Sequence, residues 1–440
     1  MVQVCMLSKW SLKSVAFLLT VMLCWAFPAF SESVKPRHLN LEQALLMAMQ
    51  NNPKLNAERS RLEVTQAAIQ TAGTRPNPSI ISDNGIGEKT YRLGIWKEFE
   101  LGGKRQRRLD LAGAELRATQ AEINTQRLKT RAEVRKAYTQ LYNAQQRQRA
   151  YEYALGAMQE LLVSAKIREK ANEQIEMDLL QAQIIQSNTN NDLQLAALEL
   201  EQSKIQLNAL LNQPLTQDLV LDPPTVAPRL SPGQVSAGSL LNEPVLIGRV
   251  EDRLELSTEE LIQQANNHRP DLRAAIVQEE VGQKQVALAK IRRIPNVRLA
   301  AGPDWVTGPG GVVGAFIMGD MELPVLNQHQ GEIQEALARQ SQLRQEELAL
   351  KHRIALEVTQ AAIAVKAQQQ RVQRFEAEVL PYGEMLARKS ITAFQTGKLS
   401  VLSTINAQHF YMGSLAGYFR ALMDYQDAIS DLEWAVGSDN

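Results

Sequence analysis

The stretch whose residue types come closest to a chemical site is "FELGGKRQRRL", residues 99–109. Gly102, Gly103 and Lys104 are residue types of a phosphate-binding loop, but the second glycine and the Lys-Ser/Thr pair are missing at the required spacing. A basic cluster of this kind is most often a solvated face and sometimes a nucleic-acid or lipid-headgroup patch. Because GxSxG and HExxH motifs are also missing from a fitting context, we expect the chain not to be an enzyme.

Histidine and cysteine give little support to a metal site. Zinc sites need closely spaced nitrogen or sulfur ligands. No His-x3-His pair occurs among the five histidines, which are His38, His268, His329, His352 and His409. Both cysteines, Cys5 and Cys24, lie in the N-terminal presequence, and Met22-Leu23 before Cys24 fits poorly with lipid attachment. We therefore expect no metal ligands, no cofactor and no disulfide in the mature chain.

The N-terminus predicts an export signal, residues 1–31. Lys9 and Lys13 precede an apolar run over 15–27, and Ala29-Phe30-Ser31 offers small residues for cleavage. The run is short for an uncleaved anchor of roughly 20 residues. Beyond residue 31 no apolar stretch is long enough for a membrane helix, so any crossing must be made by strands. The formal net charge of zero argues against nucleic acid as a partner.

The rest of the 440-residue chain is a duplication. "LNLEQALLMAMQNNPKL" and "ELSTEELIQQANNHRPDL" begin two similar stretches in which Pro53 matches Pro270, 217 positions later. The offset grows to 225 where Ala182-Gln183 match Ala407-Gln408. We therefore predict a first repeat over 32–213, a proline-rich linker over 214–256 and a second repeat over 257–440.

Each repeat has the same order of predicted elements. In the first repeat a helical segment over 41–74 ends at "GTRPNP", a strand pair follows at about 80–101, and helical tracts cover 104–168 and 175–212. The second strand pair lies at about 297–324. A helix of roughly 65 residues is about 100 Å long, which indicates coiled-coil packing in a mainly α-helical protein with a small β part.

The strand runs alternate as membrane strands do. Tyr91, Leu93, Ile95 and Phe99 share one face of the first run, and Val313, Ala315, Ile317 and Met321 share one face of its counterpart in the second repeat. Each run has about the 9 to 11 residues that a tilted strand needs to cross a bilayer. Four strands cannot close a barrel, and open edges are not tolerated in lipid. If the strands span a membrane, several chains must share one barrel.

The alternative is a periplasmic coiled-coil adaptor or a structural rod that never enters a membrane. The strand pair inside each repeat argues against it, because an adaptor has one helical hairpin between β-rich halves. The order helix, strand pair, long helix, helix, twice behind an export signal, resembles the TolC family of outer-membrane efflux factors. The motifs that carry the resemblance are "LEQALLMAMQNNPKL", "EFELGGKRQRR", "LPVLNQHQGEI", "TGKLSVLSTINAQ" and "LEWAVG".

The resemblance covers about residues 41–437 and implies both architecture and partners. It implies a homotrimer with twelve strands in the outer membrane, continuous with a long α-helical tunnel that extends into the periplasm. It also implies a passive conduit that works with a periplasmic adaptor and an inner-membrane pump. The glycine-rich form with Lys104 and Arg105 is similar to the branch that includes heavy-metal efflux members.

The resemblance also implies a gate at the helical tips, here about residues 165–178 and 384–402. In relatives a pair of acidic residues in the second-repeat tip narrows the tunnel, but Ser403 and Asn406 stand at those positions. The equivalent first-repeat positions hold Asp178 and Gln181, and Glu173 and Glu176 lie nearby. Three copies of Asp178 near one axis would attract cations. Equally, these carboxylates would be ordinary solvated tip residues.

A second set of candidate residues lies at the ends of the strand pairs. Glu98 and Glu100, with Asp320 and Glu322 in the second repeat, would place rings of negative charge in the lumen and give a mild cation preference. The alternative is ion pairing with Lys104, Arg105 or a neighbouring chain.

The stretch "FELGGKRQRRL" then marks the junction between strand and helix. Gly102 and Gly103 let the backbone turn, and Pro324 provides the corresponding break in the second repeat. Basic residues at a helix N-terminus oppose the helix dipole and need a compensating neighbour. Glu98, Glu100 and the anionic headgroups of outer-membrane lipid are the candidates.

Overall fold

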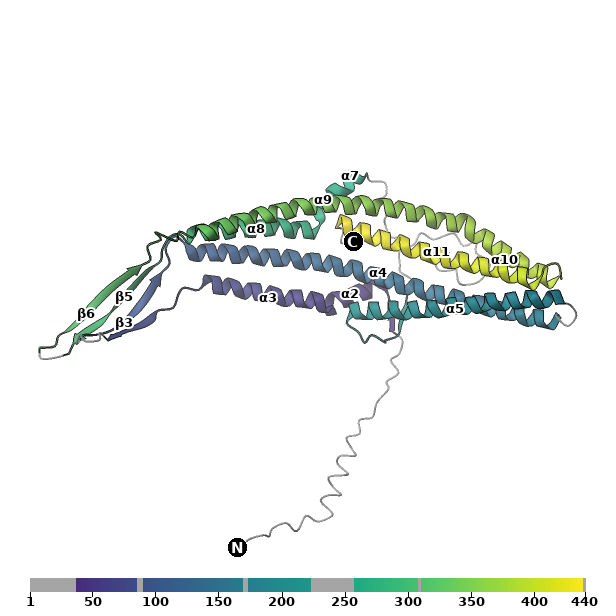
Figure 1. The fold of residues 1–440 in the computed structure, drawn as a ribbon, viewed down its shortest axis with the longest axis horizontal. Coiled ribbons are helices and arrows are strands. Elements are labelled where there is room, and N and C mark those ends of the chain that lie inside the picture. The colour runs from purple at the N-terminus through teal and green to yellow at the C-terminus, as the bar shows by residue number, and fades with distance from the viewer. Residues whose placement is uncertain (1–36, 85–89, 169–172, 223–256, 308–309, 438–440) are drawn as a thin grey trace, which may run out of the picture.

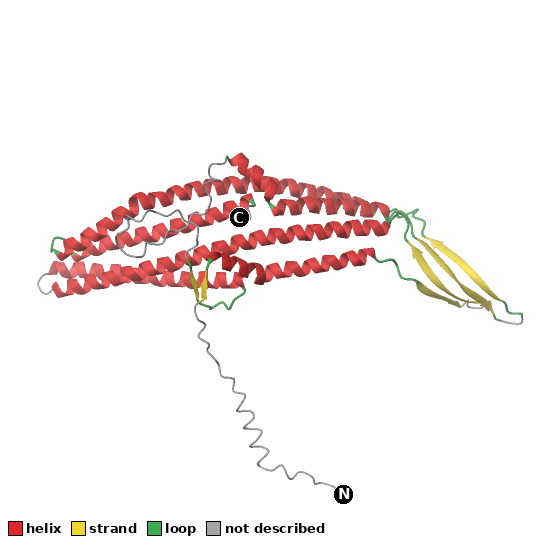
Figure 2. Ribbon diagram, turned by 180° about the vertical axis from the view of Figure 1, so that it is seen from behind, coloured by secondary structure: helices red, strands yellow, loops and turns green. Residues whose placement is uncertain are grey.

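The computed structural model describes residues 37–84, 90–168, 173–222, 257–307 and 310–437. The predicted export signal and most of the predicted linker lie outside these residues. The molecule is long and narrow: helices run along most of its length, and the strands of one sheet gather at one end (Figure 1). Figure 2 shows the same division from behind, with strands projecting beyond the helices. The prediction of a mainly helical protein with few strands is confirmed.

The first half of the chain contains one short strand, a helix pair, a strand pair and two long helices. Its elements are β1 (Arg37–Leu39), α2 (Leu41–Asn51), α3 (Pro53–Gly73), β2 (Ser79–Asn84), β3 (Thr90–Phe99), α4 (Lys104–Arg168) and α5 (Glu173–Leu211). β4 (Leu219–Leu221) follows and pairs in parallel with β1. The predicted limits of the long helix α4 coincide with the observed ones, because an uninterrupted helical sequence without proline follows Gly103.

The second half repeats this order. Its elements are α7 (Thr258–His268), α8 (Pro270–Ile291), β5 (Val297–Val306), β6 (Val313–Met321), α9 (Gln330–Arg374), a π-helical turn η1 (Phe375–Val379), α10 (Leu380–Gln395) and α11 (Val401–Val436). Unlike α4, the long helix is interrupted here: the π-turn directly precedes Pro381 in the first turn of α10, and both features bend helices. After α10, Gly397 has a φ of +73°, and Ser400 caps the N-terminus of α11.

The four longer strands form one antiparallel sheet in the order β2-β3-β5-β6. Two hairpins, one from each half of the chain, are joined through the pairing of β3 with β5. In the described part of the chain, β2 and β6 therefore each have one strand neighbour and one open edge.

The predicted helical segment over 41–74 is divided into two helices, α2 and α3. The break falls at Asn52-Pro53, where Pro53 supplies a fixed φ and lacks an N–H. The Asn52 side chain caps α3 by accepting from the N–H groups of Lys54 and Leu55. The second half breaks at the matching place, Arg269-Pro270.

The residue before each of these prolines also ties its helix pair to the end of the last helix in the same half. Asn52 Nδ2 donates to the Leu210 carbonyl oxygen at 3.1 Å, and Arg269 Nη1 donates to the Ala435 carbonyl oxygen at 3.3 Å. Leu210 and Ala435 are 225 positions apart, the offset that the sequence comparison gives for this region. Different residue types thus make the same connection in both halves.

The helices form a layer in which each long helix packs on its neighbours. Near the sheet the order is α3-α4-α8-α9, and toward the other end it is α5-α4-α11-α9. Two buried clusters hold the middle: one joins α2, α4 and α5 around Tyr138, and the other joins α7, α9 and α11 around Tyr425. Tyr138 Oη lies within hydrogen-bond distance of the carbonyl oxygens of Leu39 and Asp222, at 2.9 and 2.6 Å.

Among the described helices, none combines the length and the apolar character that a membrane span requires.

Candidate functional site

The sheet has one apolar and one charged face. Residues exposed on the apolar face include Ile80, Leu93, Ile95, Leu299 and Ile317, and Ile317 is 86% exposed. The strands β2, β3, β5 and β6 contain seven charged residues, and strand alternation with the observed register places six of them on the opposite face. Lys97 is the exception. Extensive exposed apolar area on one side of a sheet marks a surface that contacts something other than water.

The predicted acidic residues at the strand ends have partners within the same chain. Glu98 Oε1 accepts a hydrogen bond from Asn296 Nδ2 at 2.5 Å, Glu100 is ion-paired with Arg108, and Asp320 is ion-paired with Arg298. Glu322 is exposed. Ion pairing was the stated alternative to free acidic rings, but the partners are Arg108 and Arg298 in place of Lys104 and Arg105.

The junction between β3 and α4 is held by the basic residues that follow the two glycines. Both Gly102 and Gly103 have positive φ, at +74° and +77°, which glycine adopts without strain. Lys104 Nζ donates to Asn296 Oδ1 at 2.5 Å, and Arg105 Nε donates to the Gly73 carbonyl oxygen at 2.6 Å. The junction therefore ties together α3, α4 and the start of β5.

Arg108 compensates the unfavourable charge at the start of α4. Its guanidinium donates both to the Glu100 carboxylate and to the carbonyl oxygens of Ala72 and Thr74. The hydrogen bond with Glu100 raises the pKa of Arg108, whereas burial lowers the pKa of Lys104 despite the nearby charges of Glu100 and Glu98. Glu100 is thus the compensating neighbour that a basic helix N-terminus requires. Pro324 lies in the corresponding turn after β6.

The candidate gate residues lie at the end of the molecule opposite the sheet. Asp178 and Gln181 are on α5, and Ser403 and Asn406 are on the first turns of α11. The two tips pack together, since Leu179 and Ile405 belong to one buried cluster. Asp178 and Asn406 are half-buried, and Gln181 and Ser403 are exposed. Glu173 and Glu176 are in the first turn of α5, but their side chains lie outside the described residues.

Alternation along the first strand run already placed Arg92 on the charged face, but sequence reasoning missed three further residues there. Arg298 and Asp304 lie on this face, and Asp83 lies opposite Arg92. The signal was present: the alternation used for β3 and β6 also applies to β5, where it selects Arg298 and Asp304.

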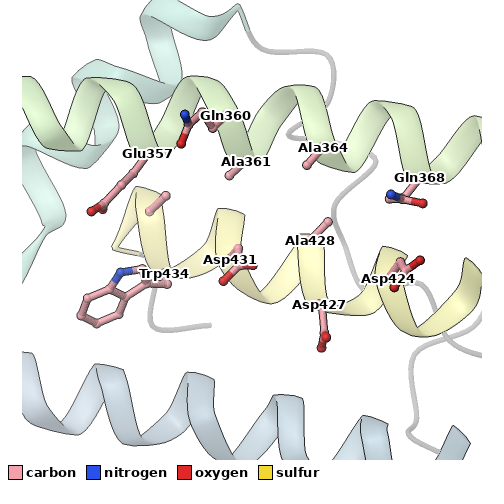
Figure 3. A pocket seen from close by; sticks show the side chains of 11 residues that line it. Glu357, Gln360, Ala361, Ala364, Gln368, Asp424, Asp427, Ala428, Asp431 and Trp434 are labelled. Carbon is pink, nitrogen blue, oxygen red and sulfur yellow. The ribbon is translucent and has the colours of Figure 1, made fainter. Parts of the chain in front are cut away.

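A groove between α9 and α11 gathers four further carboxylates, Glu357, Asp424, Asp427 and Asp431 (Figure 3). Each has a partner: Glu357 pairs with Arg269, Asp424 with Arg371 and Asp431 with Lys136, and Asp427 accepts from Gln140. Burial raises the pKa of Asp427, although that hydrogen bond and the charge of Lys136 act against it. These carboxylates hold helices together. Within the described residues no group of three or more His, Cys, Asp or Glu side chains is arranged to hold a metal ion.

Comparison with known proteins connects this architecture to efflux channels. The family model "Outer membrane efflux protein" matches residues 44–213. The cobalt-zinc-cadmium resistance protein CzcC of Cupriavidus metallidurans is 22% identical over 405 residues, which cover 91% of this chain and 90% of CzcC.

Three solved structures share the fold over 90% of this chain. The MtrE outer membrane channel of Neisseria gonorrhoeae has a TM-score of 0.69 at 16% identity and is covered over 89% of its length. The CmeC outer membrane channel of Campylobacter jejuni has a TM-score of 0.71 at 14% identity, with 85% covered. The outer membrane protein VceC of Vibrio cholerae has a TM-score of 0.66 at 18% identity, with 96% covered.

The match to the family model, the similarity to CzcC over nearly its full length and the fold shared with solved channels all agree with the two-faced sheet and the long helical layer. The predicted resemblance to the TolC family of outer-membrane efflux factors is therefore confirmed: residues 44–213 match the outer membrane efflux protein family, and the chain shares the fold of solved outer-membrane channels over 90% of its length.

Proposed function

We propose that three copies of this chain form one passive conduit through the outer membrane and across the periplasm, in a system whose adaptor and inner-membrane pump are separate proteins. The observation that carries the proposal is the four-stranded sheet with one apolar face, one charged face and two open edges. Such a sheet is not stable alone in lipid, because unpaired backbone groups at its edges would have no hydrogen-bond partner.

The sheet edges support closure between chains. The strands β2-β3-β5-β6 alternate in direction, so β6 of one chain would run antiparallel to β2 of the next. An even number of antiparallel strands per chain therefore closes without a mismatched pair. Three chains would give twelve strands. The number of chains comes from the family resemblance, and twelve strands lies within the range of 8 to 26 found in bacterial single-chain barrels.

The helical layer supports the same assembly. α5 forms one edge of the layer, and α9 with α10 forms the other. Both edges expose apolar side chains: Leu180, Ile184 and Leu195 on one, and Leu356, Ile363, Tyr382 and Met385 on the other. Two different surfaces on opposite edges of a chain allow a head-to-tail contact, which gives a ring when the rotation between copies closes. The burial of both edges would stabilise the trimer.

The repeats themselves are part of the proposal. We infer that 32–213 and 257–440 are two copies of one structural unit, joined by the segment 214–256. The matching order of elements and the equivalent hydrogen bonds of Asn52 and Arg269 support this division.

For the cargo we propose divalent metal cations. The relative CzcC is described as a cobalt-zinc-cadmium resistance protein, and the charged face of the sheet carries more carboxylates than arginines. Selection among metals would be made by the pump, since the described part of this chain has no cluster suited to tight metal coordination.

The assembly is tested by fractionation. We expect the protein in the outer membrane and as a trimer on a gel run without boiling, because the closed barrel buries all strand edges. Deletion of the gene should increase sensitivity to zinc, cobalt or cadmium while sensitivity to detergents stays constant. Recovery as a soluble periplasmic protein with no trimer would instead support a coiled-coil adaptor or rod.

The gate is tested by Asp178→Ala. If three copies of Asp178 narrow the tip, the variant should conduct more in planar bilayers and lose part of its cation preference. Asp192→Ala, on the same helix and farther from the tip, removes the same charge and serves as the control. Unchanged conductance and reversal potential in the Asp178 variant would show that Asp178 is a solvated tip residue.

A further inference from the structure

The charged face of the sheet carries its six charged side chains in two rows that run across the strands. In each row one arginine lies between two carboxylates. The turn-side row holds Asp83, Arg92 and Asp304, and the helix-side row holds Glu98, Arg298 and Asp320. Each row therefore has a formal charge of −1 per chain.

The helix-side row is fixed by direct contacts. Arg298 is ion-paired with Asp320 on β6 and lies directly opposite Glu98 on β3. Its guanidinium carbon is 5.9 Å from the ring centre of Trp96, a cation–π distance. Arg298 thus stands between the two carboxylates and is held against the sheet.

The turn-side row has the same arrangement. Arg92 Nη1 lies 3.6 Å from Asp83 Oδ2, and Arg92 is the register partner of Asp304. Gly314 lies opposite Asp304 and leaves room for its carboxylate, because a Cβ at position 314 would be 2.5 Å from Asp304 Oδ1.

The surface between the rows is uncharged. Phe316 lies opposite Gly302 and reaches across it, so that its ring would meet a Cβ added at Gly94 at 2.7 Å. Arg92 and Glu98 are six positions apart on β3, which is about 20 Å along the strand. This exceeds the Debye length of about 8 Å at physiological ionic strength, so the two rows act as separate charge layers.

Carboxylates without these arginines would suit a divalent cation. Glu98 and Asp320 lie on the same face two strands apart, about 10 Å between backbones, and Arg298 lies on the strand between them. Oxygen-rich clusters of this kind retain divalent cations, whereas passage requires sites that attract an ion but release it readily. A charge-assisted hydrogen bond from arginine occupies carboxylate oxygens that would otherwise be free for an ion.

We propose that Arg92 and Arg298 keep the two carboxylate rows from trapping the divalent cations that pass them. Each row then attracts cations through its remaining negative charge, while its arginine prevents tight coordination. This inference rests on the proposed function, since it requires that the charged face line the bore of a channel formed by several chains.

The test compares Arg298→Gln with Lys97→Gln in planar bilayers. Potassium current through the full-length trimer is measured while zinc chloride is added up to millimolar concentration. We expect the zinc concentration for half-block to fall at least tenfold in Arg298→Gln. Lys97→Gln should match the wild type. It also removes one positive charge, but Lys97 is next to Glu98 on β3 and therefore lies on the face opposite the two rows.

A second variant tests whether the change in zinc block depends on the carboxylates of the helix-side row. In Arg298→Gln/Asp320→Asn one carboxylate is removed with the arginine, so the half-block concentration should return toward the wild-type value. Arg92→Gln provides the same comparison in the turn-side row, and it replaces Arg298→Gln if that variant forms no trimer.

The outcomes separate this inference from the proposed function. A wild-type protein that forms no conducting trimer contradicts the proposed channel itself. Conducting arginine variants with wild-type zinc sensitivity, or a Lys97 variant that is equally sensitive, would overturn the role of the arginines. A double variant as sensitive as Arg298→Gln would do so as well.

Discussion

Replacing Arg269 by methionine should destabilise the protein by about 3 kcal/mol per chain, the lower end of the range for removing one partner of a buried ion pair. The Arg269 side chain is 2% exposed, and it pairs with Asp271 at 2.7 Å and with Glu357 at 2.5 Å. Burial alone would lower the pKa of Arg269, but the hydrogen bonds and charges of both carboxylates raise it overall, so the guanidinium stays charged. The variant leaves both carboxylates without their cation. Thermal unfolding of the detergent-solubilised protein, followed by circular dichroism, measures the loss.

The same arginine connects α8, α9 and α11, which is why the effect should exceed that of an ordinary surface charge. Its guanidinium carbon lies 5.3 Å from the ring centre of Trp434 on α11, a cation–π distance. Its Nη1 also donates to the Ala435 carbonyl oxygen. Gly437, at φ +74°, ends α11 directly against Arg269, and a Cβ there would be 2.9 Å from Arg269 Cα. Loss of the Arg269 side chain therefore weakens the end of α11 as well as the start of α8.

Two further variants serve as controls for this prediction. Arg273→Met, an exposed arginine one turn further along α8, should change the stability by less than about 0.5 kcal/mol. Arg269→Asn places the residue of the first half at the equivalent position, where it can cap α8 and donate to Ala435 as Asn52 does to Leu210. It should therefore be more stable than Arg269→Met. Equal melting temperatures for Arg269→Met and Arg273→Met would contradict the role of Arg269.

The elements that the sequence predicts well are those set by local signals. The limits of α4 follow from the glycine pair before Lys104 and from a long helical sequence without proline. The strands follow from period-two alternation. The short pairing of β1 with β4 was missed, because it depends on contacts between segments about 180 positions apart that no local pattern records. The π-turn at Phe375–Val379 was missed for a related reason, since the helical pattern continues through it.

The candidate site could be predicted only in part. Strand alternation predicts the face of the sheet on which a residue lies, but not the residue on the next strand that it contacts. The faces of Glu98 and Asp320 follow from alternation along their own strands. Their relation to Arg298 depends on the register between β3, β5 and β6, which hydrogen bonding between strands sets. The equivalent roles of Asn52 and Arg269 could not be predicted from the sequence either, because two different side chains make the same connection.

Replacing Gly302 by alanine should abolish the folded sheet and with it the proposed trimer. A Cβ at position 302 would lie 2.0 Å from the Leu93 carbonyl oxygen and 2.5 Å from Gly94 Cα. Both are backbone atoms, so the contact is relieved only if β3 and β5 move apart. That pairing joins the hairpins of the two halves of the chain, and its loss leaves two separate hairpins, which are marginally stable at best. The measurements are the yield of trimer on a gel run without boiling and the conductance in planar bilayers.

Gly319→Ala is the matched control in the same sheet. Its added Cβ would lie 3.3 Å from Leu299 Cδ2, the far end of a flexible side chain that can move away. We therefore expect normal trimer and conductance for Gly319→Ala and neither for Gly302→Ala. Since both variants add one methyl group to a strand glycine, a general loss of glycine flexibility would affect them alike. Only the close approach of β3 and β5 distinguishes them, so a Gly302 variant that assembles as well as the Gly319 variant would show that the two strands do not pair as described.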